Sequence, residues 1–156
     1  MRYLIVLFLL LGTANSQSVP DLALKDTLGA THNLSEFRGK VVLLNFWATW
    51  CIPCKQEMPF FVEAEKRYRD RGLIVLAASV DDSTTKKYIP KFAQSHKMNF
   101  PILVDANTDM MKKLGLSDTI PSTVFFDDQG NIAGKIVGQA KKKDLMNRLD
   151  KLLAKK

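Results

Sequence analysis

The chain has 156 residues, a formal net charge of +7 and 46% hydrophobic residues. This length is enough to bury one hydrophobic core but is short for two, so a single domain is expected once any targeting segment is removed. The positive charge gathers at Lys141–Lys143 and at residues 151–156, and without a recognition motif it does not indicate nucleic-acid binding. A solvated helix face is the simplest interpretation of these lysines; attraction of acidic partners or anionic lipid is the alternative.

The first residues have the pattern of a secretory signal peptide. Arg2 supplies a positive charge, residues 3–11 form an unbroken apolar run, and small residues at Ala14 and Ser16 favour cleavage before Gln17. An uncleaved membrane anchor is the alternative, but the apolar run is too short to span about 30 Å of hydrocarbon. We therefore expect residues 1–16 to be a cleaved signal peptide and residues 17–156 to form one exported domain.

Hydrophobic patterning along residues 17–156 predicts strands that alternate with helices. Val41–Phe46 is an apolar run interrupted only by Asn45, which is typical of a strand buried on both faces. In chain order the predicted elements are a hairpin at 19–25 and 30–33, a helical turn at 34–39, a strand at 41–46, a helix at 52–71, a strand at 73–80, a helix at 84–97, a strand at 100–104, a helix at 107–114, a hairpin at 122–126 and 132–137, and a closing helix. This order predicts an α/β fold with a central mixed sheet flanked by helices.

Breaker residues define the predicted helices more closely. Gly72 should end the helix at 52–71, in which Pro59 should introduce a kink. Pro90 indicates either a kink or a late start of the helix at 84–97. Buried faces are expected at Met58, Phe61, Val62 and Tyr68 of the first long helix and at Leu145, Leu149 and Leu152 of the closing helix.

The chain has two cysteines, Cys51 and Cys54, and they lie between the predicted strand at 41–46 and the predicted helix that follows. A disulfide between them would close a loop too small to stabilise the fold much, so a reactive role is favoured over a structural one. At the helix N-terminus Cys51 should be the attacking thiolate, and Cys54, one turn further, should resolve the mixed disulfide. Ile52 and Pro53 should set the local polarity and hence the redox potential.

Metal binding is disfavoured by the small number of ligands. Zinc requires four, and the two histidines, His32 and His96, are distant in sequence from the cysteine pair and from each other. Covalent haem attachment would need a histidine directly after the second cysteine, where Lys55 stands. We expect no metal and no cofactor beyond a redox-active Cys51–Cys54 disulfide.

Two stretches carry a family resemblance. The segment Asn45–Pro59, which reads NFWATWCIPCKQEMP, and the segment Thr119–Phe126, which reads TIPSTVFF, resemble the thioredoxin superfamily. Within it, the chain is similar to the exported thiol-disulfide oxidoreductases of the TlpA/ResA/DsbE type. The resemblance implies a thioredoxin-like fold with an N-terminal β-hairpin and a helix–strand insert at about 82–105.

The same resemblance implies a substrate platform. Pro121 matches the family's cis-proline beside the active-site disulfide, and its geometry would leave the Ile120 backbone free to pair with an extended substrate segment. Trp50, together with Ile52 and Pro53 of the cysteine motif, is expected to contact the substrate as well.

A buried acid is implied near the thiols. Glu57, three residues after Cys54, matches a glutamate of ResA-like proteins that would shuttle protons to and from Cys54; a solvated helix residue is the alternative. Asn45 stands where thioredoxin itself usually has an acidic residue. This difference makes Glu57 the better candidate for the proton shuttle.

The resemblance implies a disulfide reductase in the bacterial periplasm, soluble after signal cleavage and monomeric. Its partners would be exported proteins with cysteine thiols or disulfides and a membrane electron donor, with a possible role in cytochrome c maturation; no nucleic acid is expected. A disulfide oxidase or isomerase is the first alternative, because it uses the same chemistry at a different potential. A copper-delivery protein on the same fold is a second, but such proteins carry Cys-x-x-x-Cys and a late histidine, and none follows His96 here.

Overall fold

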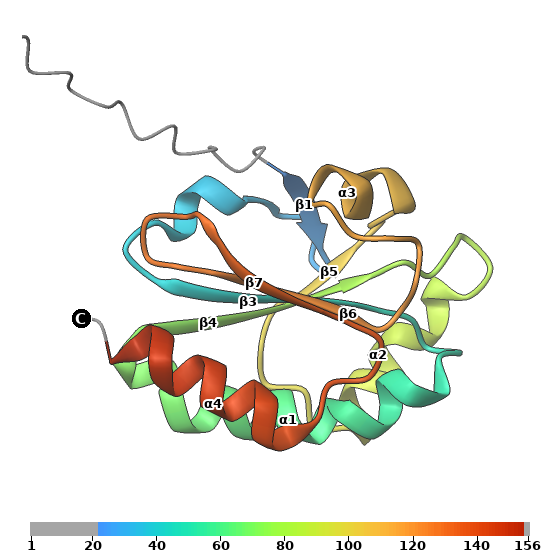
Figure 1. Ribbon diagram of the computed structural model, residues 1–156. Helices are drawn as coiled ribbons and strands as arrows, with labels where there is room; N and C mark the ends of the chain where they lie inside the picture. Colours follow the sequence, from blue (N-terminus) through green and yellow to red (C-terminus); the bar gives the residue numbers. More distant parts are fainter. Residues whose placement is uncertain (1–21, 155–156) are drawn as a thin grey trace, which may run out of the picture.

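The computed structural model describes residues 22–154, which form a seven-stranded mixed sheet with helices on both faces (Figure 1). The strand order is β2-β1-β5-β4-β3-β6-β7, with β4 parallel to β3 and β5 and the other neighbours antiparallel. The strands are β1 (Ala23–Asp26), β2 (Thr31–Asn33), β3 (Val41–Trp47), β4 (Leu73–Ser79), β5 (Ile102–Val104), β6 (Ser122–Phe126) and β7 (Ile132–Val137). The predicted α/β, thioredoxin-like fold class is confirmed.

The helices form two layers around this sheet. In Figure 1 the long helices α1 and α4 lie side by side under one face, and α3 lies over the other. The helices and helical turns are η1 (Leu34–Phe37), α1 (Ile52–Tyr68), η2 (Arg69–Arg71), η3 (Lys86–Tyr88), α2 (Ile89–Ser95), α3 (Thr108–Lys113) and α4 (Lys142–Leu153). None of the helices within residues 22–154 is both long enough and apolar enough to cross a membrane.

A hydrophobic core lies on each face of the sheet. Strand β3 contributes to both cores because its side chains alternate between the two faces. Val41, Leu43 and Trp47 belong to the core shared with α1, α2 and α4. Val42, Leu44 and Phe46 belong to the core on the other face, which α3 covers. All seven residues of the strand are buried, which explains why nearly all of them are apolar. Asn45 is the polar exception, and it faces α1.

The helix boundaries confirm some predictions and correct others. The first long helix continues through η2 and ends at Gly72, whose φ of 89° lies in the left-handed region that glycine adopts without strain. The helix predicted at 84–97 is wrong in its extent, because a turn precedes η3 and α2 starts only at Ile89, before Pro90. In α4 Leu153 is buried beside Leu145 and Leu149, and Leu152 is half-buried and packs against the same core. The predicted signal peptide lies outside the described residues.

Candidate active site

The two cysteines lie at the junction between β3 and α1. Cys51 is the N-cap of α1 and forms a disulfide with Cys54, and its Sγ accepts a hydrogen bond from the Cys54 N–H at 3.3 Å. Cys51 keeps a small exposed fraction of 4%, whereas Cys54 is fully buried. The N–H groups and dipole of a helix N-terminus stabilise a thiolate, so the geometry favours Cys51 as the attacking sulfur and Cys54 as the resolving one.

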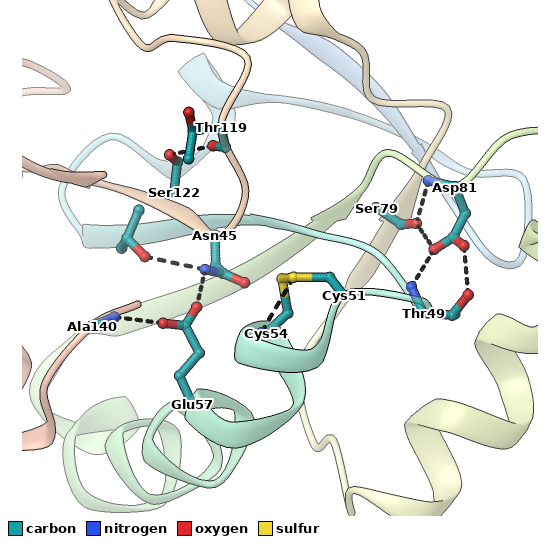
Figure 2. Close-up of a disulfide and its surroundings, with 11 residues drawn as sticks. Asn45, Thr49, Cys51, Cys54, Glu57, Ser79, Asp81, Thr119, Ser122 and Ala140 are labelled. Atoms are coloured by element: carbon teal, nitrogen blue, oxygen red, sulfur yellow. Dashed lines mark hydrogen bonds between the residues drawn. A yellow bond between two sulfur atoms is a disulfide. The ribbon is translucent and has the colours of Figure 1, made fainter. Parts of the chain in front are cut away.

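A buried glutamate lies one turn beyond Cys54 on the same helix. Glu57 is fully buried, and its two carboxylate oxygens accept hydrogen bonds from Asn45 Nδ2 at 2.9 Å and from the Ala140 N–H at 2.7 Å. Burial raises the pKa of Glu57 to about 7, against the opposing effect of the two hydrogen bonds. Figure 2 shows its carboxylate between Ala140 and Asn45, below the strand and beside the disulfide. Glu57 can therefore exchange a proton near neutral pH.

Asn45 joins three elements in this site. Its Nδ2 donates to Glu57 on α1 and also to Thr123 Oγ1 on β6, at 3.1 Å. Since Asn45 itself lies on β3, the amide connects the central strand, its neighbour and the active-site helix. The structure therefore joins Asn45 to Glu57, which lies one turn beyond Cys54 on α1.

The Ile120–Pro121 peptide bond is cis, as the resemblance implied. Pro121 directly precedes β6, the neighbour of β3, and its carbonyl accepts a hydrogen bond from the Gly138 N–H at 2.8 Å. Within residues 22–154 the backbone N–H and C=O of Ile120 have no hydrogen-bond partner. Those two groups remain available to an extended peptide, which is the role predicted for Ile120.

Apolar side chains surround the exposed edge of the disulfide. Trp50 is 58% exposed and Ile52 is 68% exposed, an unusual state for large apolar residues in an otherwise well-buried chain. A hollow of about 380 Å³ separates Trp50 from the insert that carries α2. Its lining includes two aromatic rings of the insert and two lysines, namely Tyr88, Phe92, Lys55 and Lys91. Trp50, which the sequence analysis expects to contact the substrate, thus lines the same hollow as residues of the insert.

Asp81 is a site residue that sequence reasoning missed. This carboxylate is only 4% exposed and accepts hydrogen bonds from the Thr49 N–H at 2.8 Å, the Thr49 hydroxyl at 2.6 Å and the Ser79 hydroxyl at 2.7 Å (Figure 2). It thus ties the end of β4 to the loop two residues before Cys51. The available sequence signal was an acid just after a buried strand, next to the strand that leads to the cysteines.

Replacing Asp81 with asparagine should loosen this loop. A neutral amide is a weaker acceptor than a carboxylate, and its NH₂ group would force the Thr49 hydroxyl to turn from donor to acceptor, so the hydrogen bonds that hold this loop should weaken. We expect the free energy of unfolding in urea to fall by about 1–3 kcal/mol, and disulfide exchange to slow. The matched control is Asp82→Asn, which changes an exposed carboxylate that holds the turn at Thr84 and should cause a smaller loss. Equal losses in the two variants would contradict a special role for Asp81.

The two histidines occupy separate parts of the molecule. His32 Nε2 lies 3.0 Å from Asp26 Oδ2 in the N-terminal hairpin, and the His96 ring stacks on Phe92 with 3.9 Å between the ring centroids. Within residues 22–154 no three potential ligand side chains (His, Cys, Asp or Glu) are grouped so that they could hold a metal ion.

Comparison with known proteins places this geometry in a family. A family model described as the AhpC/TSA family matches residues 16–135 of the chain. The chain belongs to the AhpC/TSA family. Among relatives of this AhpC/TSA protein, the thiol-disulfide oxidoreductase ResA of Geobacillus thermodenitrificans is 34% identical over 139 residues, covering 89% of this chain and 78% of ResA. The thioredoxin-like protein YneN of Bacillus subtilis is 35% identical over 144 residues, covering 89% of this chain and 81% of YneN.

A solved structure agrees with the sequence relatives. The crystal structure of a thiol:disulfide interchange protein of the DsbE type from Chlorobium tepidum has a TM-score of 0.78 and 28% identity, covering 87% of this chain and 95% of that one. The predicted membership of the thioredoxin-like TlpA/ResA/DsbE group is confirmed. Together with the bonded cysteine pair at the start of α1, these relatives identify this AhpC/TSA protein as a thiol-disulfide oxidoreductase.

Proposed function

We propose that the protein is a disulfide reductase that acts outside the cytoplasm on the cysteines of exported proteins. The observation that carries the proposal is the buried Glu57. It lies one helical turn from Cys54, and its pKa is raised to about 7. A reductase must deprotonate its resolving thiol after the first attack, and an ionised Glu57 is the base at that position. The signal-peptide pattern at residues 1–16 supports the location.

The reaction uses the chain's own sulfurs and no further cofactor. The Cys51 thiolate attacks a substrate disulfide, releases one substrate thiol and forms a mixed disulfide. Cys54 then loses its proton to Glu57 and attacks Cys51 Sγ, which releases the second substrate thiol and forms the Cys51–Cys54 disulfide. A membrane-bound dithiol donor would restore the reduced state. Trp50, Ile52 and the free Ile120 backbone would hold the substrate as an extended segment beside the disulfide.

Equilibration with glutathione tests the direction of this reaction. We expect the Cys51–Cys54 dithiol to reduce oxidised glutathione, so that most of the protein is oxidised in a glutathione buffer of balanced composition. The measurement is the oxidised fraction after acid quenching and thiol alkylation, over a series of glutathione ratios. A dithiol that stays reduced in mildly oxidising buffer would instead identify an oxidase or isomerase.

Trapping with Cys54→Ser tests the substrate class. This variant keeps the attacking Cys51 but cannot resolve the mixed disulfide, so covalent adducts should accumulate in the exported fraction of the native bacterium. The adducts should disappear on treatment with dithiothreitol and should be absent from Cys51→Ser, the matched control. Adducts with an apocytochrome c would assign the protein to cytochrome c maturation, whereas an absence of any adduct would contradict the two-thiol mechanism.

A further inference from the structure

Asn45 has a buried acceptor atom that the oxidised protein leaves without a partner. The side chain is only 1% exposed, and its Nδ2 donates to both Glu57 and Thr123. No donor among the described residues reaches its Oδ1. Buried polar atoms are nearly always hydrogen-bonded in folded proteins, so an acceptor without a partner at this place requires a physical reason.

The unpartnered oxygen faces the redox centre. Figure 2 shows the Asn45 oxygen pointing toward the Cys51–Cys54 disulfide. Cys54 and Glu57 are three residues apart on α1 and so lie on one face of the helix, and it is this face that meets Asn45. A disulfide sulfur has no hydrogen to donate, whereas a thiol does. Reduction of the disulfide would therefore place a possible donor, the Cys54 thiol, on the side that this oxygen faces.

The orientation of the amide follows from its neighbour. The NH₂ group of Asn45 donates to Glu57 and to Thr123, so the oxygen of the same amide faces away from Glu57, toward the sulfurs. An aspartate at position 45 could not donate to Glu57, and an apolar residue would offer nothing to a thiol. Asparagine meets both requirements.

We propose that Asn45 Oδ1 accepts a hydrogen bond from the Cys54 thiol in the reduced protein and thereby stabilises the dithiol relative to the disulfide. Reduction by an incoming dithiol transfers two electrons and two protons. The two S–H bonds of the donor give way to its disulfide, the Cys51–Cys54 bond breaks, and each of these sulfurs receives one proton. The proton on Cys54 supplies the missing donor for Asn45. This stabilisation of the dithiol does not depend on whether the protein acts as a reductase or as an oxidase in the cell.

Infrared spectroscopy of the Cys51→Ser variant tests the hydrogen bond directly. Cys54 is then the only cysteine of the chain, so the S–H stretching band reports this thiol alone. We expect the band at lower wavenumber than that of a simple alkyl thiol in an apolar solvent, and we expect Asn45→Leu in this background to raise it. A Cys54 band at the position of a free thiol would overturn the proposal without any change at Asn45. An unshifted band in the double variant would overturn it as well.

The redox equilibrium gives an independent readout in the two-cysteine protein. Asn45→Leu removes the acceptor that favours the dithiol. The equilibrium constant for oxidation of this variant by glutathione should therefore rise about threefold to tenfold, where tenfold corresponds to about 30 mV in reduction potential. Thr123→Val is the matched control, since it removes a different hydrogen bond of the same amide and leaves Oδ1 in place. Its S–H band and redox equilibrium should match those of the parent protein. Equal shifts in the two variants would show that general loosening of the site, and not the acceptor, sets the equilibrium.

Discussion

Replacing Cys51 with serine should abolish catalysed disulfide reduction, so that only the uncatalysed reduction of the substrate by dithiothreitol remains. Cys51 is the N-cap of α1, it receives the hydrogen bond from the Cys54 N–H, and it has the exposed fraction that Cys54 lacks. A serine hydroxyl is not ionised near neutral pH and does not undergo exchange with a disulfide. The measurement is the turnover of a protein disulfide such as insulin, with dithiothreitol as the electron source.

The partner variant separates the two sulfurs. Cys54→Ser should retain the first attack, seen as one equivalent of aromatic thiol released from an activated disulfide, but should fail to turn over. Cys51→Ser should release little thiol, because Cys54 is fully buried. Rapid release by Cys51→Ser and none by Cys54→Ser would reverse the assignment of attacking and resolving thiols.

Replacing Glu57 with glutamine should slow the resolving step and change its dependence on pH. The fraction of ionised Glu57 rises through a pKa of about 7, so wild-type exchange should accelerate as pH rises through neutrality. Without the base we expect a rate about 10²-fold lower at pH 8 and loss of this inflection, with only the rise due to thiol ionisation remaining. Rates that stay equal to wild type across pH would contradict a role for Glu57 in proton transfer. Glu63→Gln, a partly exposed change on the same helix, is the control.

The same residue links pH to stability. The folded protein raises the pKa of Glu57 from 4.5 to about 7, so between these pH values the native state holds a proton that the unfolded chain has released. The contribution is complete below pH 4.5 and is lost as pH rises to 7, by about 3 kcal/mol in total, since one pKa unit corresponds to about 1.4 kcal/mol. Urea unfolding at several pH values should show this decline in wild type and in Glu63→Gln, but not in Glu57→Gln.

The strands and the long helices could be predicted because each buries a continuous or periodic apolar face. Strand β3 is the clearest case, since both of its faces are covered and the run of apolar residues is interrupted only at Asn45. The prediction failed at Thr84 and Thr85, where the Asp82 carboxylate accepts hydrogen bonds from both backbone N–H groups and favours a turn over a helix. Such local competition between side chain and backbone is not visible in hydrophobic periodicity.

The site, like the fold, contains some residues that could be predicted from the sequence and others that could not. The disulfide, Glu57 and Pro121 could be predicted because their residue types and spacing form one recognisable pattern. Asp81 and Ala140 could not, because they reach the site through the fold from distant parts of the chain. Ala140 contributes only a backbone N–H, which any residue except proline would offer. Contacts of this kind become visible only in three dimensions.

The placement of β5 makes the N-terminal hairpin and the insert depend on each other. Strand β1 pairs with β5 at Lys25–Val104 and Asp26–Leu103, and β5 in turn pairs with β4. The hairpin therefore reaches the sheet through the insert, and the insert strand has its far edge covered by the hairpin. Removing either one alone would leave a row of unpaired backbone groups at a sheet edge, where another chain could add. Removal of the hairpin would expose the edge of β5, whereas removal of the insert would expose the edge of β4 and also leave the hairpin without a partner strand.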